Sequence, residues 1–157
     1  MLATFHALSG GIILKTIPDP RIALPLAFLS HFILDSVPHW DFTTSLSKED
    51  SPQKPLTLAG RKDRKKIFVL AAFDVILGFG LTFWLFQNLN PYWLFGSMIF
   101  AQLPDWLEIP YFFGGYKIAP SIWVKRFQHR VHSRLYLPWG LITQIAIFVP
   151  LLWWILA

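Results

Sequence analysis

The chain contains no cysteine and few charged residues, and these absences narrow the functions it can have. Without cysteine, disulfide frameworks and thiolate metal sites are excluded. No serine nucleophile elbow, phosphate-binding Walker loop or His-Glu-x-x-His motif occurs in the sequence. Charged residues make up 15% of the 157 residues and hydrophobic residues 54%, a high apolar fraction for a soluble domain. A chain of this length predicts one domain, residues 1–157.

The hydrophobic residues gather in long runs that resemble membrane spans. Five apolar segments can be recognised, at residues 2–17, 22–37, 67–87, 91–113 and 135–157. Because about 20 apolar residues in a helix cross a bilayer, the sequence predicts an all-α polytopic membrane protein with about five transmembrane helices. The first two segments are short for a complete span. Between the segments we expect two long loops, at 38–66 and 114–134.

The basic residues are distributed unevenly around these segments. The two long loops carry twelve of the 14 lysines and arginines, and only Lys15 and Arg21 fall on the opposite side. The positive-inside rule then predicts a cytoplasmic N-terminus, cytoplasmic loops and an external C-terminus. The net charge of +5 is explained by orientation and by attraction to lipid headgroups. We therefore expect membrane lipid as a partner, and no nucleic acid.

Two histidines and two aspartates occur within eleven residues, from His31 to Asp41. In a helix, His31 and Asp35 lie one turn apart on the same face. His39 and Asp41 follow Pro38, where the helix should end. Imidazole nitrogen and carboxylate oxygen are ligands of catalytic Zn²⁺ and related ions. The sequence therefore predicts a metal site here. The alternative is that Asp35 caps a turn and His39 contacts lipid headgroups.

The predicted topology brings the remaining polar residues to the same membrane face. His6 and Asp74 begin helices there, Asp105 and Glu108 end one, and the 114–134 loop contains His129 and His132. We predict a shared site with the metal ligands His6, His31, Asp35, His39, Asp74, Asp105, His129 and His132. Asp41 or Glu108 is expected to act as general base, and Arg130 to hold substrate oxygens. Capping, pairing of Asp74 with an arginine, and headgroup contacts are the alternatives.

A faint internal repeat agrees with this interpretation. His6 is followed by Gly10 and Gly11, and Asp74 is followed by Gly78 and Gly80. About thirty residues later, each half has a proline next to tryptophan and acidic residues. The repeat predicts two related helical hairpins, followed by a C-terminal helix.

Several short motifs resemble those of a known family. They are His6, Leu103-Pro104-Asp105, His129-Arg-x-His132-Ser133 and Ser30-His31-x-x-x-Asp35. Together they resemble the LexA-binding, inner-membrane-bound metal-dependent hydrolases. Residues 31–41 are also similar to the motif of zinc-dependent phospholipase C and single-strand nuclease. These resemblances imply metal-assisted phosphoester hydrolysis in a bacterial-type inner or plasma membrane.

The sequence as a whole predicts a membrane-bound metal-dependent hydrolase. We expect it to act on a phosphoester or lipid-linked substrate at the cytoplasmic interface. Its cofactor would be one or two divalent ions, for which Zn²⁺ fits best and Mn²⁺ or Mg²⁺ are alternatives. A small ion or proton transporter and a non-catalytic scaffold with a structural metal are the competing interpretations. The substrate and the oligomeric state stay open.

Overall fold

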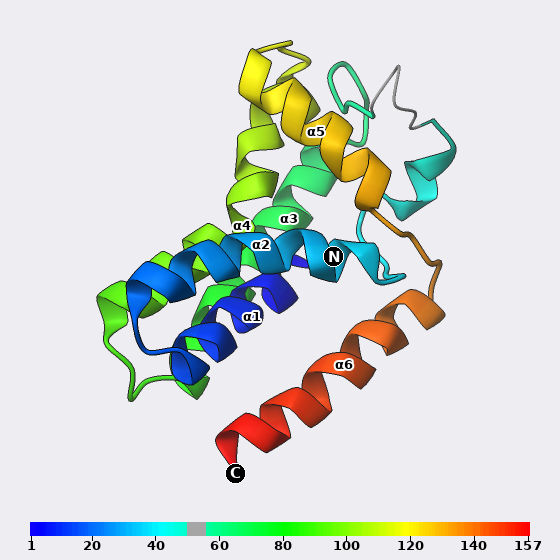
Figure 1. Ribbon diagram of the computed structural model, residues 1–157. Helices are drawn as coiled ribbons and strands as arrows, with labels where there is room; N and C mark the ends of the chain where they lie inside the picture. Colours follow the sequence, from blue (N-terminus) through cyan, green and yellow to red (C-terminus); the bar gives the residue numbers. More distant parts are fainter. Residues whose placement is uncertain (50–55) are drawn as a thin grey trace.

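The computed structural model describes residues 1–49 and 56–157, with the side chains of 47–49 left out (Figure 1). Lys54 and the side chain of Lys48, both counted among the basic residues above, lie outside this part. The described chain is all-helical. Its elements are α1 (Ala3–Thr16), α2 (Pro20–Ser36), the 3₁₀ helix η1 (Thr44–Glu49), α3 (Arg64–Leu85), α4 (Pro91–Gly114), α5 (Ala119–Val131) and α6 (Trp139–Leu156). The all-α prediction is confirmed, and each of the five apolar segments corresponds to a helix.

One of the two expected long loops contains a helix instead. Within 114–134, α5 begins with Pro120 in its first turn, a position where the fixed φ of proline favours helix formation. Its buried residues are Ser121, Lys125 and Gln128, which share one face at i, i+4 and i+7 spacing. Because this buried face is polar, a search for apolar runs misses the helix. Packing against α4 and α2 provides the contacts that hold it.

Helix α1 lies at the centre of the fold and contacts α2, α3, α4 and α6. Small residues allow two of these contacts to be close. A Cβ atom added at Gly10 would lie 2.7 Å from the carbonyl oxygen of Ser97, and one added at Gly78 would lie 2.6 Å from the Cα of Thr4. Gly80, the repeat partner of Gly11, has no atom within 4 Å of its added Cβ. The internal repeat itself stays a prediction.

The helices form two hairpins, α1–α2 and α3–α4, whose connections lie at the same end of the molecule (lower left in Figure 1). The core near this end is apolar. It includes Ile12, Leu14, Ala23, Phe86 and Leu94. The polar residues singled out above lie toward the other end, where α1 begins and α2 ends. The hairpins thus separate an apolar core from a polar site.

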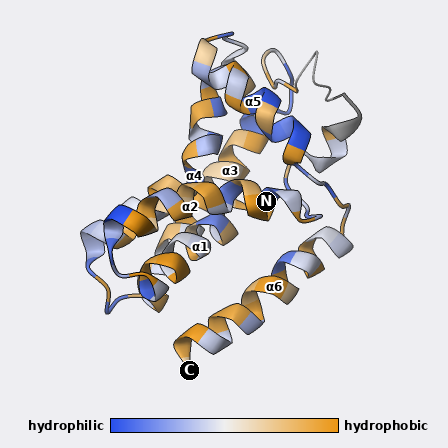
Figure 2. Ribbon diagram, viewed as in Figure 1, coloured by the Kyte–Doolittle hydropathy of each residue, from blue (hydrophilic) through white to orange (hydrophobic). Residues whose placement is uncertain are grey.

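Many large apolar side chains are exposed, and hydrophobic residues predominate along α6 in Figure 2. Within the described residues, α3 and α6 are the two helices long and apolar enough to cross a membrane. Both carry large exposed side chains, such as Ile76 on α3 and Trp153 on α6. Five complete spans are not shown. The 14 residues of α1 make a helix of about 21 Å, shorter than the hydrocarbon layer of roughly 30 Å.

Candidate metal centre

Asp35, in the last turn of α2, lies at the centre of a buried group of histidines. Its Oδ1 atom is 3.3 Å from His6 Nε2 and 3.7 Å from His39 Nε2. Its Oδ2 atom is 3.3 Å from His31 Nε2 and 3.5 Å from His132 Nδ1. The side chains of Asp35, His6, His31 and His39 are at most 1% exposed. One carboxylate is therefore surrounded by four imidazoles from four parts of the chain.

These separations are long for hydrogen bonds and short enough for ligands of a common ion. Hydrogen-bonded nitrogen and oxygen atoms are usually about 2.7–3.2 Å apart. Two ligand atoms that are each about 2.1 Å from a tetrahedral Zn²⁺ lie about 3.4 Å from each other. The four carboxylate–imidazole distances, 3.3 to 3.7 Å, are close to that value. The donor set and its spacing both fit a divalent metal.

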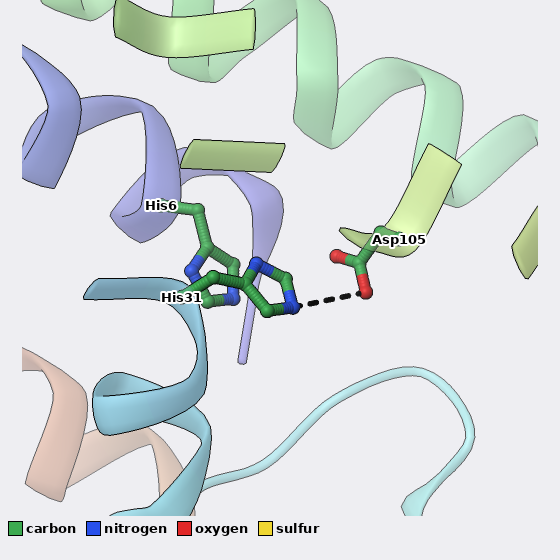
Figure 3. Close-up of side chains that lie close together, drawn as sticks. All are labelled: His6, His31 and Asp105. Carbon is green, nitrogen blue, oxygen red and sulfur yellow. Dashed lines mark ion pairs between the residues drawn. The ribbon is translucent and has the colours of Figure 1, made fainter. Parts of the chain in front are cut away.

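The potential ligands form two neighbouring groups. In one, the ligand atoms of His6, His31 and Asp105 all lie within 4.8 Å of one another, and in the other those of Asp35, His39 and His132 do so. Figure 3 shows the first group, with side chains from α1, α2 and α4. His31 Nε2 lies 3.4 Å from an oxygen of Asp105, and the His6 and His31 rings stack with centroids 4.1 Å apart. Two adjacent ions, or one, can be accommodated.

Backbone carbonyls orient two of the histidines. His31 Nδ1 donates to the carbonyl oxygen of Ala101 at 2.8 Å, and His39 Nδ1 donates to that of Val37 at 2.7 Å. With Nδ1 donating to a carbonyl, Nε2 of each ring faces the centre, which is the ring orientation found in metal sites. Nε2 of His6 lies 3.3 Å from Asp35 Oδ1, whereas its Nδ1 is buried and makes no hydrogen bond to any described residue. A buried nitrogen of this kind usually has a partner, such as a water molecule or an ion.

His39 is neutral at physiological pH, as a metal ligand must be. Burial, together with the positive charges of the Met1 amino group and His132, lowers the pKa of His39 to about 3. The Met1 amino group is itself buried, 2.6 Å from Asp35 Oδ1. The centre thus already accommodates positive charge beside its carboxylate.

Asp41 contacts His132 on the side of the ring away from Asp35. Its Oδ2 atom lies 3.2 Å from His132 Nε2. Its Oδ1 atom accepts from the backbone N–H of Thr43 at 2.6 Å and from the hydroxyls of Thr43 and Thr44. Burial alone would raise the pKa of Asp41, but its interaction with His132 holds that pKa well below the usual range. Asp41 is placed to orient His132, and the general-base role expected of Asp41 or Glu108 stays a prediction.

Contacts between two distant segments bring His132 beside α2. The backbone N–H of Ser133 donates to the carbonyl of Asp35 at 2.8 Å, and the N–H of His39 donates to that of Ser133 at 3.2 Å. The N–H of Leu135 then donates to the carbonyl of His39 at 2.7 Å. These bonds form one short parallel bridge. They position the second ligand group.

A cavity of about 440 Å³ adjoins the centre. Asp41, Asp105 and His132 line it, so both ligand groups reach it. Glu108 is also in its wall, where Glu108 Oε2 lies 2.9 Å from the Nζ atom of Lys125. The predicted acid Glu108 is thus near the centre, and it is paired with a cation.

Asp74 is placed differently from the prediction. Its carboxylate accepts from the backbone N–H of Ala3 at 2.6 Å and from the backbone N–H and hydroxyl of Thr4 at 3.3 and 2.6 Å. These groups begin α1, whose first N–H groups have no partner inside the helix. Asp74 belongs to neither ligand group. It caps α1 from the neighbouring helix and so holds the turn that carries His6.

Two predicted residues of α5 are also placed differently. His129 belongs to neither group of potential ligands. Arg130 is exposed and does not line the cavity, whereas Arg134 does. The helical turn of α5 explains this, because only one face of the helix meets the site. Arg134 follows the helix and lies in the bridge beside His39.

Sequence reasoning missed Gln128. Its amide nitrogen donates to His31 Nε2 at 2.7 Å and to Asp105 Oδ1 at 3.2 Å. His31 Nε2 and Asp105 Oδ1 therefore both face the amide nitrogen of Gln128. The spacing of Ser121, Lys125 and Gln128 was the available signal, since it places three polar residues on one helical face.

Comparison of this chain with protein-family models, curated proteins and solved structures found no match. The resemblance to the LexA-binding, inner-membrane-bound hydrolases stays a prediction from short motifs. The function has to be inferred from the site itself.

Proposed function

We propose that this chain is a membrane-bound metal-dependent hydrolase that acts on a phosphoester or lipid-linked substrate. The observation that carries the proposal is the Asp35 carboxylate, which lies within 3.7 Å of four imidazoles beside an accessible cavity. Burying this many ionisable groups is unfavourable unless they are paired or bind a metal. A catalytic metal also needs an open side for substrate.

One or two divalent ions would be held by His6, His31 and Asp105 and by Asp35, His39 and His132. Nitrogen-rich ligands favour Zn²⁺, with Mn²⁺ or Mg²⁺ as alternatives. Such an ion supplies Lewis acidity and can lower the pKa of a water molecule to about 7. Among the protein groups, Asp41 orients His132. Glu108 is the candidate for proton transfer at the cavity wall.

Two cations in the cavity wall could contact an anionic substrate. Lys125, which pairs with Glu108, and Arg134 line the cavity, and a bound metal would offset the carboxylates of Asp41, Asp74 and Asp105 that line it too. Arginine matches the geometry of phosphate oxygens and lysine provides a point charge. We assign the role expected of Arg130, holding substrate oxygens, to Arg134.

The membrane location is supported by the outer surface of α5. Trp123 and Phe127 are 66% and 50% exposed, and the basic residues Arg126 and Arg130 lie near them on the same helix. Aromatic and basic side chains together are typical of a helix that lies in the membrane interface. Together with the positive-inside rule, this supports the proposal that the centre lies at the cytoplasmic membrane surface.

The competing functions are less well supported. A transporter needs polar groups along its path, but the described core at the hairpin end is apolar, with Ile12, Leu94 and Phe148 among its buried residues. A structural metal is usually enclosed by four ligands, whereas Asp105 and His132 line an accessible cavity. The accessible side favours catalysis over a scaffold role.

Elemental analysis of the purified protein tests the proposal. Wild type should contain one or two equivalents of a divalent metal and hydrolyse a simple phosphodiester. Asp35→Ala should lose both properties, because Asp35 contacts all four histidines of the centre. Asp63→Ala is the matched control, since Asp63 is partly exposed and pairs with Arg61. Absence of stoichiometric metal from wild type would overturn the proposal, and metal without turnover would favour the scaffold.

A further inference from the structure

The cavity extends from the metal centre into an apolar arm between α3 and α4. We define the apolar arm by Phe68, Ala71 and Val75 of α3 and Trp106, Ile109 and Phe112 of α4, all of which line the cavity. None of these side chains can donate to or accept from a substrate, except for the indole N–H of Trp106. The arm is therefore built to hold hydrocarbon.

The mouth of the apolar arm opens onto an apolar surface. Phe68, Ile76 and Ile109 line the cavity and are also 53%, 70% and 44% exposed. Two of them belong to α3, a helix long and apolar enough to cross a membrane. A mouth with such a rim faces lipid in preference to water.

Charged side chains line the rest of the cavity. Lys125, Arg134 and the carboxylates of Asp41, Asp74, Asp105 and Glu108 all do so, and Lys125 Nζ lies 4.9 Å from the ring centre of Phe112 at the edge of the arm. A ligand that contacts both kinds of lining would have a hydrocarbon tail in the arm and an anionic head bound by the two cations and a metal ion. The volume of about 440 Å³ is near the lower end of the range for ligand sites, about 300–1,000 Å³. The cavity thus accommodates a head and part of one chain.

We propose that the substrate is a phosphate-bearing amphiphile that enters sideways from the bilayer and places one hydrocarbon chain in the apolar arm. This inference rests on the proposed function, because it takes the metal centre as the site that meets the phosphate. It adds the substrate class and the route of entry. Because each buried CH₂ group contributes about 0.8 kcal/mol, affinity should rise about four-fold for each CH₂ added until the arm is full.

Calorimetric titration of metal-loaded protein in lipid nanodiscs tests this inference, with alkylphosphonates of increasing chain length as non-hydrolysable probes. Wild type should show the four-fold rise for each CH₂ and should bind inorganic phosphate most weakly. Ala71→Trp fills the arm and should abolish the dependence on chain length. Val75→Trp fills the same arm from one turn further along α3 and should do the same. Leu70→Trp is the matched control, because Leu70 is exposed on α3 and does not line the cavity.

The outcomes separate this inference from the hydrolase proposal. Turnover of a methyl phosphodiester, measured in parallel, should be equal in wild type and Leu70→Trp, and wild type, Ala71→Trp and Leu70→Trp should all retain their metal. If wild type cleaves the methyl ester but binds all chain lengths equally, the proposal of an amphiphilic substrate is wrong and the proposal of hydrolase activity is still supported. Chain-length dependence without turnover would overturn hydrolysis alone. Equal dependence in wild type and in both filling variants would show that the chain lies elsewhere.

Discussion

Replacing Asp74 by alanine should destabilise α1 and leave the number of bound metal ions unchanged. Asp74 serves three donors at the start of α1, the backbone N–H groups of Ala3 and Thr4 and the hydroxyl of Thr4. Removing the carboxylate leaves these groups without their acceptor in a partly buried place. His6 follows two residues later, so the loosened turn also carries a potential ligand.

The expected loss can be worked out from these contacts. Removing a capping side chain costs about 0.5–2 kcal/mol, and a buried donor left without an acceptor costs about 1–3 kcal/mol. Since Asp74 is 6% exposed and serves three donors, we expect the free energy of unfolding to fall by about 2–4 kcal/mol in Asp74→Ala. Asp74→Asn keeps one acceptor oxygen and should lose about half as much.

Denaturant unfolding in detergent and elemental analysis at saturating metal together check this prediction. Metal affinity should fall about 10–100-fold, as it does when a supporting contact of a ligand is lost, but saturation should restore the full stoichiometry. Asp63→Ala controls for the loss of an acidic residue, because Asp63 directly precedes α3 and pairs with Arg61. If Asp74→Ala unfolds like wild type and binds fewer ions at saturation, Asp74 is a ligand and the capping role is refuted.

Three further predictions follow from other contacts. Gly78→Ala should destabilise the protein in thermal unfolding, because its Cβ would lie 2.6 Å from Thr4 Cα, whereas Gly80→Ala should be neutral or slightly stabilising. In metal-free protein, acidification from pH 6.5 toward 4 should lower the free energy of unfolding, since unfolded histidine protonates near 6.5 whereas the pKa of folded His39 is about 3 and that of folded His6 about 4. His39→Asn should make this slope shallower in denaturant titrations, and His6 should account for the remainder. Removing the metal with a chelator should lower Tm, because the free energy of unfolding falls by about 4 kcal/mol if the metal had been present at 1,000 times its Kd. An unchanged Tm would contradict a metal site in the folded protein.

The sequence predicted well what depends on neighbouring residues. Apolar runs located five of the six helices, because a helix that faces lipid or core on most sides needs few polar residues. The spacing of His31 and Asp35 predicted their shared face, and Pro38 marked the end of that helix. These are properties of local backbone geometry, and each can be read within a few turns.

The partners of each polar group could not be predicted in this way. Asp74 was expected to bind metal, yet it caps α1, since only the packing of α3 on α1 brings the start of one helix to the middle of the other. Gln128 was missed and Arg130 was expected in place of Arg134, because the orientation of α5 depends on its contacts with α4 and α2.

By itself, the sequence determined the helices, the His31–Asp35 pair and the gathering of polar residues at one end. Only the tertiary structure decided that Asp35 lies among four imidazoles and that a cavity connects them to an apolar arm. The reason is physical. Helix formation and burial follow from local periodicity, whereas a site depends on which distant segments pair, and that is decided by close contacts such as the bridge between His39 and Arg134.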